Sequence, residues 1–359
     1  MCKVSTVVGA QSAVDPESDA LDVNLDGLLE SPSHFPLRLS LADDLLAFVQ
    51  LKRLDYRRAS FLDPRGLPDD ALLWQASFSE LQHALPAPEP PRRLGYLFHT
   101  GFCCSTLLSR CAEISPAVFA LREPMSLHNL EVQLAGAGRA FSREQCHGAL
   151  ATLLALLGRT WSDRQIAFIK ADCTLLVPAM LQYSPAPYVA LYCPVHDFLA
   201  AVMSCKARRA WTIGRLRQMI EIAHAMGMAV PFEIPAQLNA PEAACLIWWW
   251  QMRIFREAQE KARARGYLLA AEAFLNDPMA SLSRLFGLLD ATYPTAGLAA
   301  LAARVMSRDA KTPAQPGNAT SRREKLAATT SDHAEQIELA LQWALRWIGP
   351  EFQTIGATA

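Results

Sequence analysis

Hydrophobic residues gather in five short apolar runs, separated by longer segments with helical spacing. Each run is short and ends in turn residues, which predicts a buried strand. The runs cover residues 94–98, 118–122, 165–170, 187–193 and 266–271. Helical spacing covers residues 125–135, 143–158, 174–183, 196–211, 213–228, 241–265, 277–289, 294–305 and 332–347. Strands that alternate with helices predict an α/β fold, a three-layer sandwich with a parallel sheet.

The N-terminal quarter follows a different pattern. Residues 1–35 are polar and acidic without periodicity, which predicts a loose leader. Residues 36–93 have helical spacing broken by prolines and end in the connector PAPEPPRR, so we expect a helical extension. The α/β domain should then occupy residues 94–350, with a polar loop at 306–321 before the last helix.

The stretch LGYLFHTGFCCSTLL, residues 94–108, predicts a strand, a loop of small and hydroxyl residues, and a helix. The first N–H groups of such a helix point outward, and the helix dipole adds partial positive charge, so this arrangement favours a bound anion. Ser105 and Thr106 could add hydroxyl donors to a phosphate. An ordinary βα turn fits this stretch equally well. The motifs GxxxxGK[ST] and GxGxxG are absent, which disfavours a P-loop NTPase and a Rossmann domain.

Two further strand ends carry polar residues. Glu123 follows the second predicted strand, and Lys170 and Asp172 lie at the end of the third. The carboxyl ends of parallel strands meet at one edge of a sheet, where ligands bind. We therefore expect these side chains to lie near His99 and the loop that follows it.

Composition limits the function classes. Hydrophobic residues make up 51% of the 359 residues, which is ample for a core. Lys plus Arg number 34 and Asp plus Glu 35, a balance that argues against broad nucleic-acid binding. The nine cysteines show no metal-ligand spacing, which favours free thiols in a reducing compartment. With neither a signal peptide nor an apolar run of ~20 residues, we expect a cytoplasmic protein without a membrane span.

Taken in order, four segments within residues 94–347 resemble the sulfotransferases that use 3′-phosphoadenosine 5′-phosphosulfate (PAPS), especially their bacterial branch. LFHTGFCCSTLL is similar to the 5′-phosphosulfate loop, and LREP at 121–124 to the segment after the second strand. IKADCTLLVP at 169–178 resembles the lysine-threonine-histidine stretch, and AEAFLNDPMASLSRL at 271–285 the glutamate-aspartate-leucine-leucine stretch.

The resemblance implies roles for the residues at the three strand ends. Lys170 would neutralise charge on the departing phosphate, and Glu123 or Asp172 would be the general base. Glu123 is the favoured base because His99 could orient it or share its proton. The loop would bind the donor through Thr100, Gly101, Phe102, Cys103, Cys104, Ser105 and Thr106.

The chain departs from this family at the positive charges. Phe102 stands where the family loop carries a lysine or arginine. The family's arginine and serine for the 3′-phosphate align with Cys193 and Ala201, or with Tyr192 and Ala200. Basic or hydroxyl residues further along the chain are expected to replace these contacts. The candidates are Ser204, Lys206, Arg208, Arg209, Arg308, Lys311, Arg322 and Arg323.

The leading hypothesis is a PAPS-dependent sulfotransferase that needs no metal and acts on a hydroxyl or amine of a small-molecule acceptor. One alternative is a degenerate relative that keeps the fold and serves a binding or interaction role. A nucleotide-dependent kinase is the other, and it would require a magnesium-binding carboxylate beside Thr106. The sequence names neither the acceptor nor the oligomeric state.

Overall fold

The computed structural model describes residues 5–7, 25–85, 93–135, 143–262, 265–294, 296–312 and 319–357. Its centre is a five-stranded parallel sheet in the order β6-β7-β5-β8-β9. The strands are β5 (Leu94–His99), β6 (Val118–Arg122), β7 (Ile166–Ala171), β8 (Tyr188–Tyr192) and β9 (Gly266–Ala270). Every residue of β5 to β8 is buried, as expected for strands covered on both faces.

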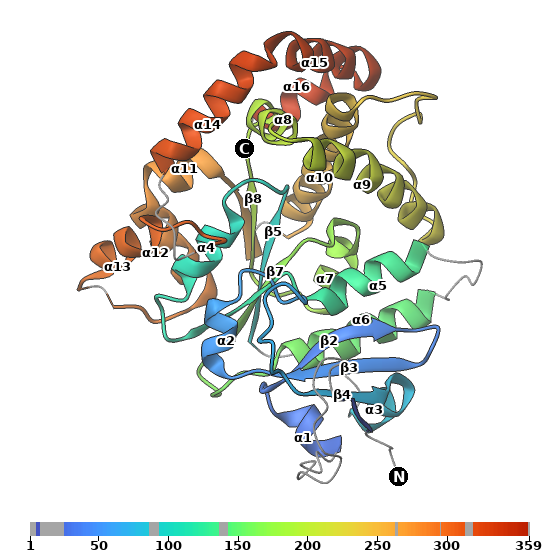
Figure 1. The fold of residues 1–359 in the computed structure, drawn as a ribbon, viewed down its shortest axis with the longest axis vertical. Coiled ribbons are helices and arrows are strands. Elements are labelled where there is room, and N and C mark those ends of the chain that lie inside the picture. Colours follow the sequence, from blue (N-terminus) through green and yellow to red (C-terminus); the bar gives the residue numbers. More distant parts are fainter. Residues whose placement is uncertain are drawn as a thin grey trace.

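Helices cover both faces of this sheet (Figure 1). One face carries α4 (Ser105–Ala112), α11 (Ala271–Asn276), α12 (Pro278–Leu289) and α13 (Leu298–Met306). The other face carries α5 (Met125–Ala135), α6 (Arg143–Leu157), α7 (Val177–Tyr183), α9 (Lys206–Ala225) and α10 (Ala240–Lys261). A 3₁₀ turn, Thr174–Leu176, precedes α7. The predicted three-layer α/β sandwich is therefore confirmed.

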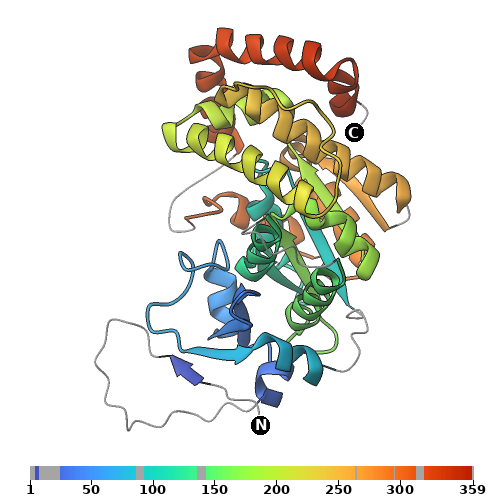
Figure 2. The same ribbon diagram turned by 90° about the vertical axis from the view of Figure 1, so that its right-hand side faces the viewer.

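The remaining C-terminal helices gather beyond the carboxyl ends of the strands, at the top of Figure 1. They are α8 (Val195–Met203), α14 (Ala319–Asp332), α15 (Ala334–Ile348) and α16 (Glu351–Ala357). Figure 2 shows α14, α15 and α16 at the end of the molecule opposite the N-terminal region. This layer places helices directly above the edge of the sheet where ligands bind in α/β proteins.

The predicted helical extension at 36–93 is wrong. Together with a strand from the leader, the described part of this region forms an antiparallel sheet in the order β1-β4-β3-β2, which packs against α5 and α6. Its strands are β1 (Ser5–Val7), β2 (His34–Ser40), β3 (Leu45–Gln50) and β4 (Leu73–Ser77), with helices α1 (Leu25–Glu30), α2 (Arg53–Arg58) and α3 (Phe78–Ala84). Runs such as LLAFVQ satisfy helical and strand spacing alike, and only tertiary pairing separates the two.

Two boundaries also differ from the sequence prediction. The break expected near residue 212 falls at Cys205, which is extended with φ −159° and ψ 156° and precedes α9. Thr212 lies inside α9, where its hydroxyl donates to the Arg208 carbonyl at 2.8 Å. The described residues of the leader, expected to be loose, form β1, α1 and the start of β2. The connector at 86–92 and the loop centre at 313–318 lie outside the described residues.

Candidate anion-binding site

Three neighbouring strands end together at one edge of the parallel sheet. In the sheet register Leu97 pairs with Lys170, and Lys170 pairs with Arg122. His99 is the last residue of β5 and Glu123 follows β6 directly, so both lie at the same edge. The backbone N–H of Glu123 donates to the Lys170 carbonyl at 2.8 Å, which extends the pairing past β6.

The loop after β5 has an unusual backbone. Gly101, Phe102 and Cys104 all have positive φ, at 80°, 52° and 66°. Such values are costly for side chains other than glycine, and they cluster at functional sites. Among the described residues, no carbonyl accepts a hydrogen bond from the N–H groups of residues 102–107; the first of α4 to do so is Leu108. Consecutive unpaired N–H groups that lead into a helix form an anion-binding concavity.

Lys170 lies at this concavity, against the first turn of α4. Its side chain is 1% exposed, and Nζ donates to Oγ1 of Thr106 at 3.0 Å. Nζ also forms an ion pair with the carboxylate of Glu123. A charge buried this deeply needs such partners, and an anion on the loop would add another.

His99 connects the loop to the carboxylate. Its Nδ1 accepts a hydrogen bond from the Gly101 N–H at 3.2 Å, which leaves the proton of the neutral ring on Nε2. Nε2 lies 3.5 Å from Oε1 of Glu123. Burial lowers the pKa of His99 well below its usual value, and the charge of Lys170 lowers it further. His99 is therefore suited to orient Glu123 as a neutral donor.

The two candidate bases have opposite electrostatics. Burial raises the pKa of Glu123, and the nearby charge of Lys170 opposes that rise. For Asp172 burial also favours the neutral acid, but the contact with His128 and the charge of Arg215 outweigh it and hold the pKa well below its usual range. A carboxylate with a raised pKa is the better proton acceptor.

A second polar cluster surrounds Asp172 and includes residues that the sequence analysis missed. Nδ1 of His128 lies 3.4 Å from Oδ2 of Asp172, and Arg215 donates to the Asp172 carbonyl at 3.3 Å. Arg215 also pairs with the fully buried Glu131 at 2.8 Å, and Glu131 accepts the N–H of Leu175 at 2.9 Å. These contacts fix the chain just after β7, so the cluster positions Asp172.

Two arginines contact Phe102 of the loop. Arg322 of α14 donates to the Phe102 carbonyl at 3.1 Å and lies 3.4 Å from the carboxylate of Asp197. The guanidinium of Arg208 lies 4.8 Å from the centre of the Phe102 ring and donates to Oγ of Ser204 at 3.0 Å. The structure therefore brings Ser204, Arg208 and Arg322 together at the loop.

The other basic candidates after residue 300 are Lys311, Arg323 and Arg308, and each has different contacts. Lys311 is near enough for its charge to act on Glu123 and Lys170. Arg323, the neighbour of Arg322 on α14, contacts Asn276 instead. Arg308 follows α13, and its backbone N–H donates to the Val305 carbonyl at 3.3 Å.

The N-terminal region also reaches this edge, which the sequence analysis did not predict. Lys170 and Lys311 lie 5.5 and 5.2 Å from the centre of the Phe61 ring. The hydroxyl of Ser60 donates to the Lys311 carbonyl at 2.8 Å. Buried Arg122 donates to the Tyr56 carbonyl at 2.8 Å and anchors this segment to β6. Only the tertiary structure brings an aromatic residue from position 61 to this site.

The cysteines of the loop are packing residues. Cys103 and Cys193 are buried free thiols, and Sγ of Cys103 donates to the Leu191 carbonyl of β8 at 3.4 Å. Burial raises the pKa of both thiols, which makes them poor nucleophiles. Thr100 is buried beside them, and its N–H donates to the same Leu191 carbonyl at 3.2 Å. These contacts hold the loop against β8.

Comparisons with known proteins place the chain near two solved structures. The crystal structure of the sulfotransferase STF9 from Mycobacterium avium aligns with 72% of this chain and 79% of its own, at 13% identity and a TM-score of 0.36. A sulfotransferase domain from the curacin biosynthetic pathway aligns with 74% of this chain and 96% of its own, at 10% identity and a TM-score of 0.37. No protein-family model matches the chain, and no curated protein matches it.

The described residues lack two features, a membrane-spanning helix and a metal-binding group of side chains. None of the described helices combines the length and the apolar character needed to cross a membrane. Across the same residues, His, Cys, Asp and Glu side chains form no group of three or more that could hold a metal ion.

Proposed function

We propose that this chain is a sulfotransferase that moves a sulfuryl group from PAPS to a hydroxyl or amine of a small-molecule acceptor. The observation that carries the proposal is the buried Lys170, which links Thr106 at the start of α4 to Glu123. This contact joins an anion-binding backbone, a cation and a carboxylate base at one strand edge. Sulfuryl transfer needs all three, because charge develops on the leaving phosphate while the acceptor loses a proton.

The donor fits the residues around the loop. The N–H groups of residues 102–107, which donate to no carbonyl of the described residues, and the hydroxyls of Ser105 and Thr106 would hold the 5′-phosphosulfate. Arg322 and Arg208, which contact Phe102, would supply the positive charge that the loop itself lacks. We assign the 3′-phosphate to these arginines together with Ser204, and we retain Arg308 as a further candidate.

The residues divide the reaction between them. Glu123 accepts the proton of the acceptor hydroxyl or amine, and His99 orients its carboxylate. The acceptor atom bonds to sulfur as the bond from sulfur to the bridging oxygen breaks, and the electron pair stays on that oxygen. Lys170 neutralises this charge on the leaving adenosine 3′,5′-bisphosphate. Asp172, held by His128 and Arg215 with a lowered pKa, serves as a fixed negative charge.

The alternatives fit this site less well. A degenerate relative that had lost its nucleotide site would lack cations at the loop, whereas Arg208 and Arg322 both contact Phe102. A kinase would require a carboxylate free to hold magnesium beside Thr106. The partner of Thr106 is the ammonium of Lys170, which also occupies Glu123.

The test is transfer from labelled PAPS to a panel of hydroxyl and amine acceptors. We expect transfer by the wild type and none by the Lys170→Met, Glu123→Gln double variant, which removes the buried pair without leaving a charge. If adenosine 3′,5′-bisphosphate binds but no acceptor is labelled, the binding-protein alternative replaces this proposal. Transfer from ATP and magnesium in place of PAPS would support the kinase instead.

A further inference from the structure

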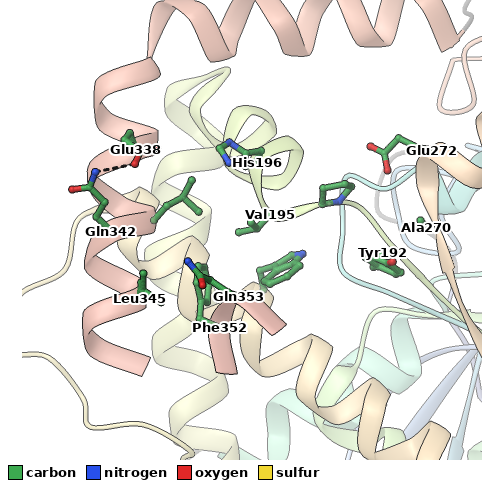
Figure 3. Close-up of a pocket in the computed structure, with 13 residues that line it drawn as sticks. Tyr192, Val195, His196, Ala270, Glu272, Glu338, Gln342, Leu345, Phe352 and Gln353 are labelled. Atoms are coloured by element: carbon green, nitrogen blue, oxygen red, sulfur yellow. Dashed lines mark hydrogen bonds between the residues drawn. The ribbon is translucent and has the colours of Figure 1, made fainter. Parts of the chain in front are cut away.

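A cavity lies at the same sheet edge, beyond the ends of β8 and β9 (Figure 3). Its volume is about 580 Å³, within the range of small-molecule sites. Helices α15 and α16 close one side, and α8 and α10 contribute to the rest. The lining residues are Tyr192, Pro194, Val195, His196, Trp248, Ala270, Glu272, Glu338, Leu341, Gln342, Leu345, Phe352 and Gln353. None of them belongs to the loop that follows β5.

Aromatic rings form the deep part of this cavity. Trp248 is 1% exposed, and its indole N–H already donates to the Cys193 carbonyl at 2.8 Å. Its N–H is therefore not available to a ligand, and its ring atoms line the cavity. The ring of Phe352 packs edge-on against it, with centroids 6.0 Å apart, and Tyr192 adds a third ring. Such rings attract a cation through their negative faces.

The charged groups of the lining are carboxylates. Glu338 and Glu272 appear on opposite sides of the cavity in Figure 3. Glu338 is exposed on α15 and accepts a hydrogen bond from Gln342 at 2.8 Å. No lysine or arginine is among the lining residues, and His196 at the rim is their one basic side chain.

The cation whose charge acts on Glu272, Arg322, contacts other groups. Burial and the hydrogen bond that Glu272 shares with the carboxyl of Asp197 raise the pKa of Glu272, and the charge of Arg322 opposes that rise. Arg322, however, contacts Asp197 and donates to the Phe102 carbonyl, on the side of the anion-binding loop. A positive ligand on the cavity side of Glu272 would favour the ionised form of this side chain.

We propose that this cavity binds a small organic cation, an ammonium group carried on an apolar or aromatic body. The ammonium would lie between the carboxylates and the faces of Tyr192, Trp248 and Phe352, and the apolar body would contact Val195, Leu341 and Leu345. An anionic nucleotide would meet two carboxylates here. The inference is independent of the proposed transfer reaction, since it uses none of the residues assigned to donor binding or catalysis.

The probe is benzyltrimethylammonium, titrated by ligand-observed NMR and calorimetry into the full chain. Its neutral isostere neopentylbenzene and the anion phenylacetate are the matched controls. We expect the cation to bind at least about tenfold more tightly than the neutral isostere, and the anion to show no binding. Equal binding of the cation and the neutral isostere would overturn the proposal, because it would show an apolar pocket without charge selection.

Variants locate the bound probe. Glu338→Gln, at an exposed position, should weaken binding of the cation about threefold to tenfold, whereas Glu335→Gln, on the same helix but outside the lining, should leave it unchanged. Leu345→Trp should fill the cavity and abolish binding. Binding that survives Leu345→Trp in a folded protein would place the cation elsewhere and reject this site.

Discussion

The two halves of one sheet edge have opposite chemistry. At the ends of β6, β7 and β5, four basic side chains lie around the loop whose N–H groups donate to no carbonyl of the described residues. They are Lys170, Arg208, Lys311 and Arg322. The ends of β8 and β9 open instead on aromatic rings and two carboxylates. A parallel sheet offers a binding edge, but the residues after each strand and the helices above them decide which charge binds there.

Backbone strain separates the same two regions. The described residues contain five non-glycine positions with positive φ, and Phe102, Cys104 and Glu123 are three of them. All three lie at the cationic half of the edge. The other two, Asp44 and Asp290, lie outside both regions. Strain is therefore concentrated where we place the reaction, as expected when a backbone is held for function.

The largest expected effect comes from Lys170. Lys170→Met leaves Glu123 without its partner, so the free energy of unfolding should fall by about 3–5 kcal/mol. Adding Glu123→Gln should restore most of this loss in urea denaturation without restoring transfer. Binding of benzyltrimethylammonium at the other half should be unchanged in the double variant. A double variant as unstable as Lys170→Met would show that the pair is not what stabilises this edge.

Arg322 lies between the two halves and should affect them in opposite directions. Arg322→Ala should weaken binding of adenosine 3′,5′-bisphosphate about tenfold, because a charge-assisted contact is lost. The same change should strengthen binding of benzyltrimethylammonium slightly, since Asp197 and Glu272 lose a nearby positive charge. Calorimetry measures both, with Arg323→Ala as the control, because Arg323 contacts Asn276. If Arg322→Ala weakened the binding of both ligands to the same extent, the substitution would have disturbed the fold rather than one binding site.

A smaller effect should come from the strained loop. Cys104→Gly should stabilise the protein by about 1 kcal/mol, since glycine adopts a φ of 66° without the steric cost. Cys104→Ala removes the same thiol but keeps Cβ, so it should bring no such gain. Chemical denaturation of the two variants measures the difference. If Cys104→Gly and Cys104→Ala were equally stable, the positive φ of residue 104 would carry no steric cost.

The smallest effect concerns pH. The contact with Asp172 raises the pKa of His128 in the folded protein. Protonated His128 therefore stabilises the fold fully at pH values below about 6.5, the pKa of histidine in the unfolded chain. This stabilisation is lost as the pH rises through the raised pKa of the folded state. The lowered pKa of Asp172 adds stability that disappears only in acid. The urea midpoints of wild type and His128→Gln should therefore differ more at about pH 5.5 than at about pH 8.5. A difference that grows with pH would contradict this pairing.

The sequence predicted the parallel sheet well because its strands are short, continuous apolar runs. Val118–Arg122 forms β6 with the expected bounds, and the other four strands agree within two residues at each end. Such runs are typical of strands buried on both faces. The N-terminal antiparallel sheet was missed because its apolar spacing fits a helix as well, and its pairing depends on distant residues.

The cationic site could be predicted only where residues follow strands directly. His99, Glu123, Lys170 and Asp172 were found from their positions after apolar runs. His128, Glu131 and Arg215 lie on helices, and no local pattern distinguishes them from solvated polar residues. The residues that line the proposed cation-binding cavity come from β8, β9 and several helices, and they span roughly 160 residues of sequence from Tyr192 to Gln353. No local sequence motif could therefore indicate this cavity.

The central claim is that the cationic half of the edge binds a nucleotide with phosphates at both 3′ and 5′ positions. Calorimetric titration with adenosine 3′,5′-bisphosphate tests it most directly. We predict micromolar binding by the wild type, no binding by the Lys170→Met, Glu123→Gln double variant, and unchanged binding by Glu338→Gln. Absence of binding by the folded wild type at millimolar nucleotide would contradict the account.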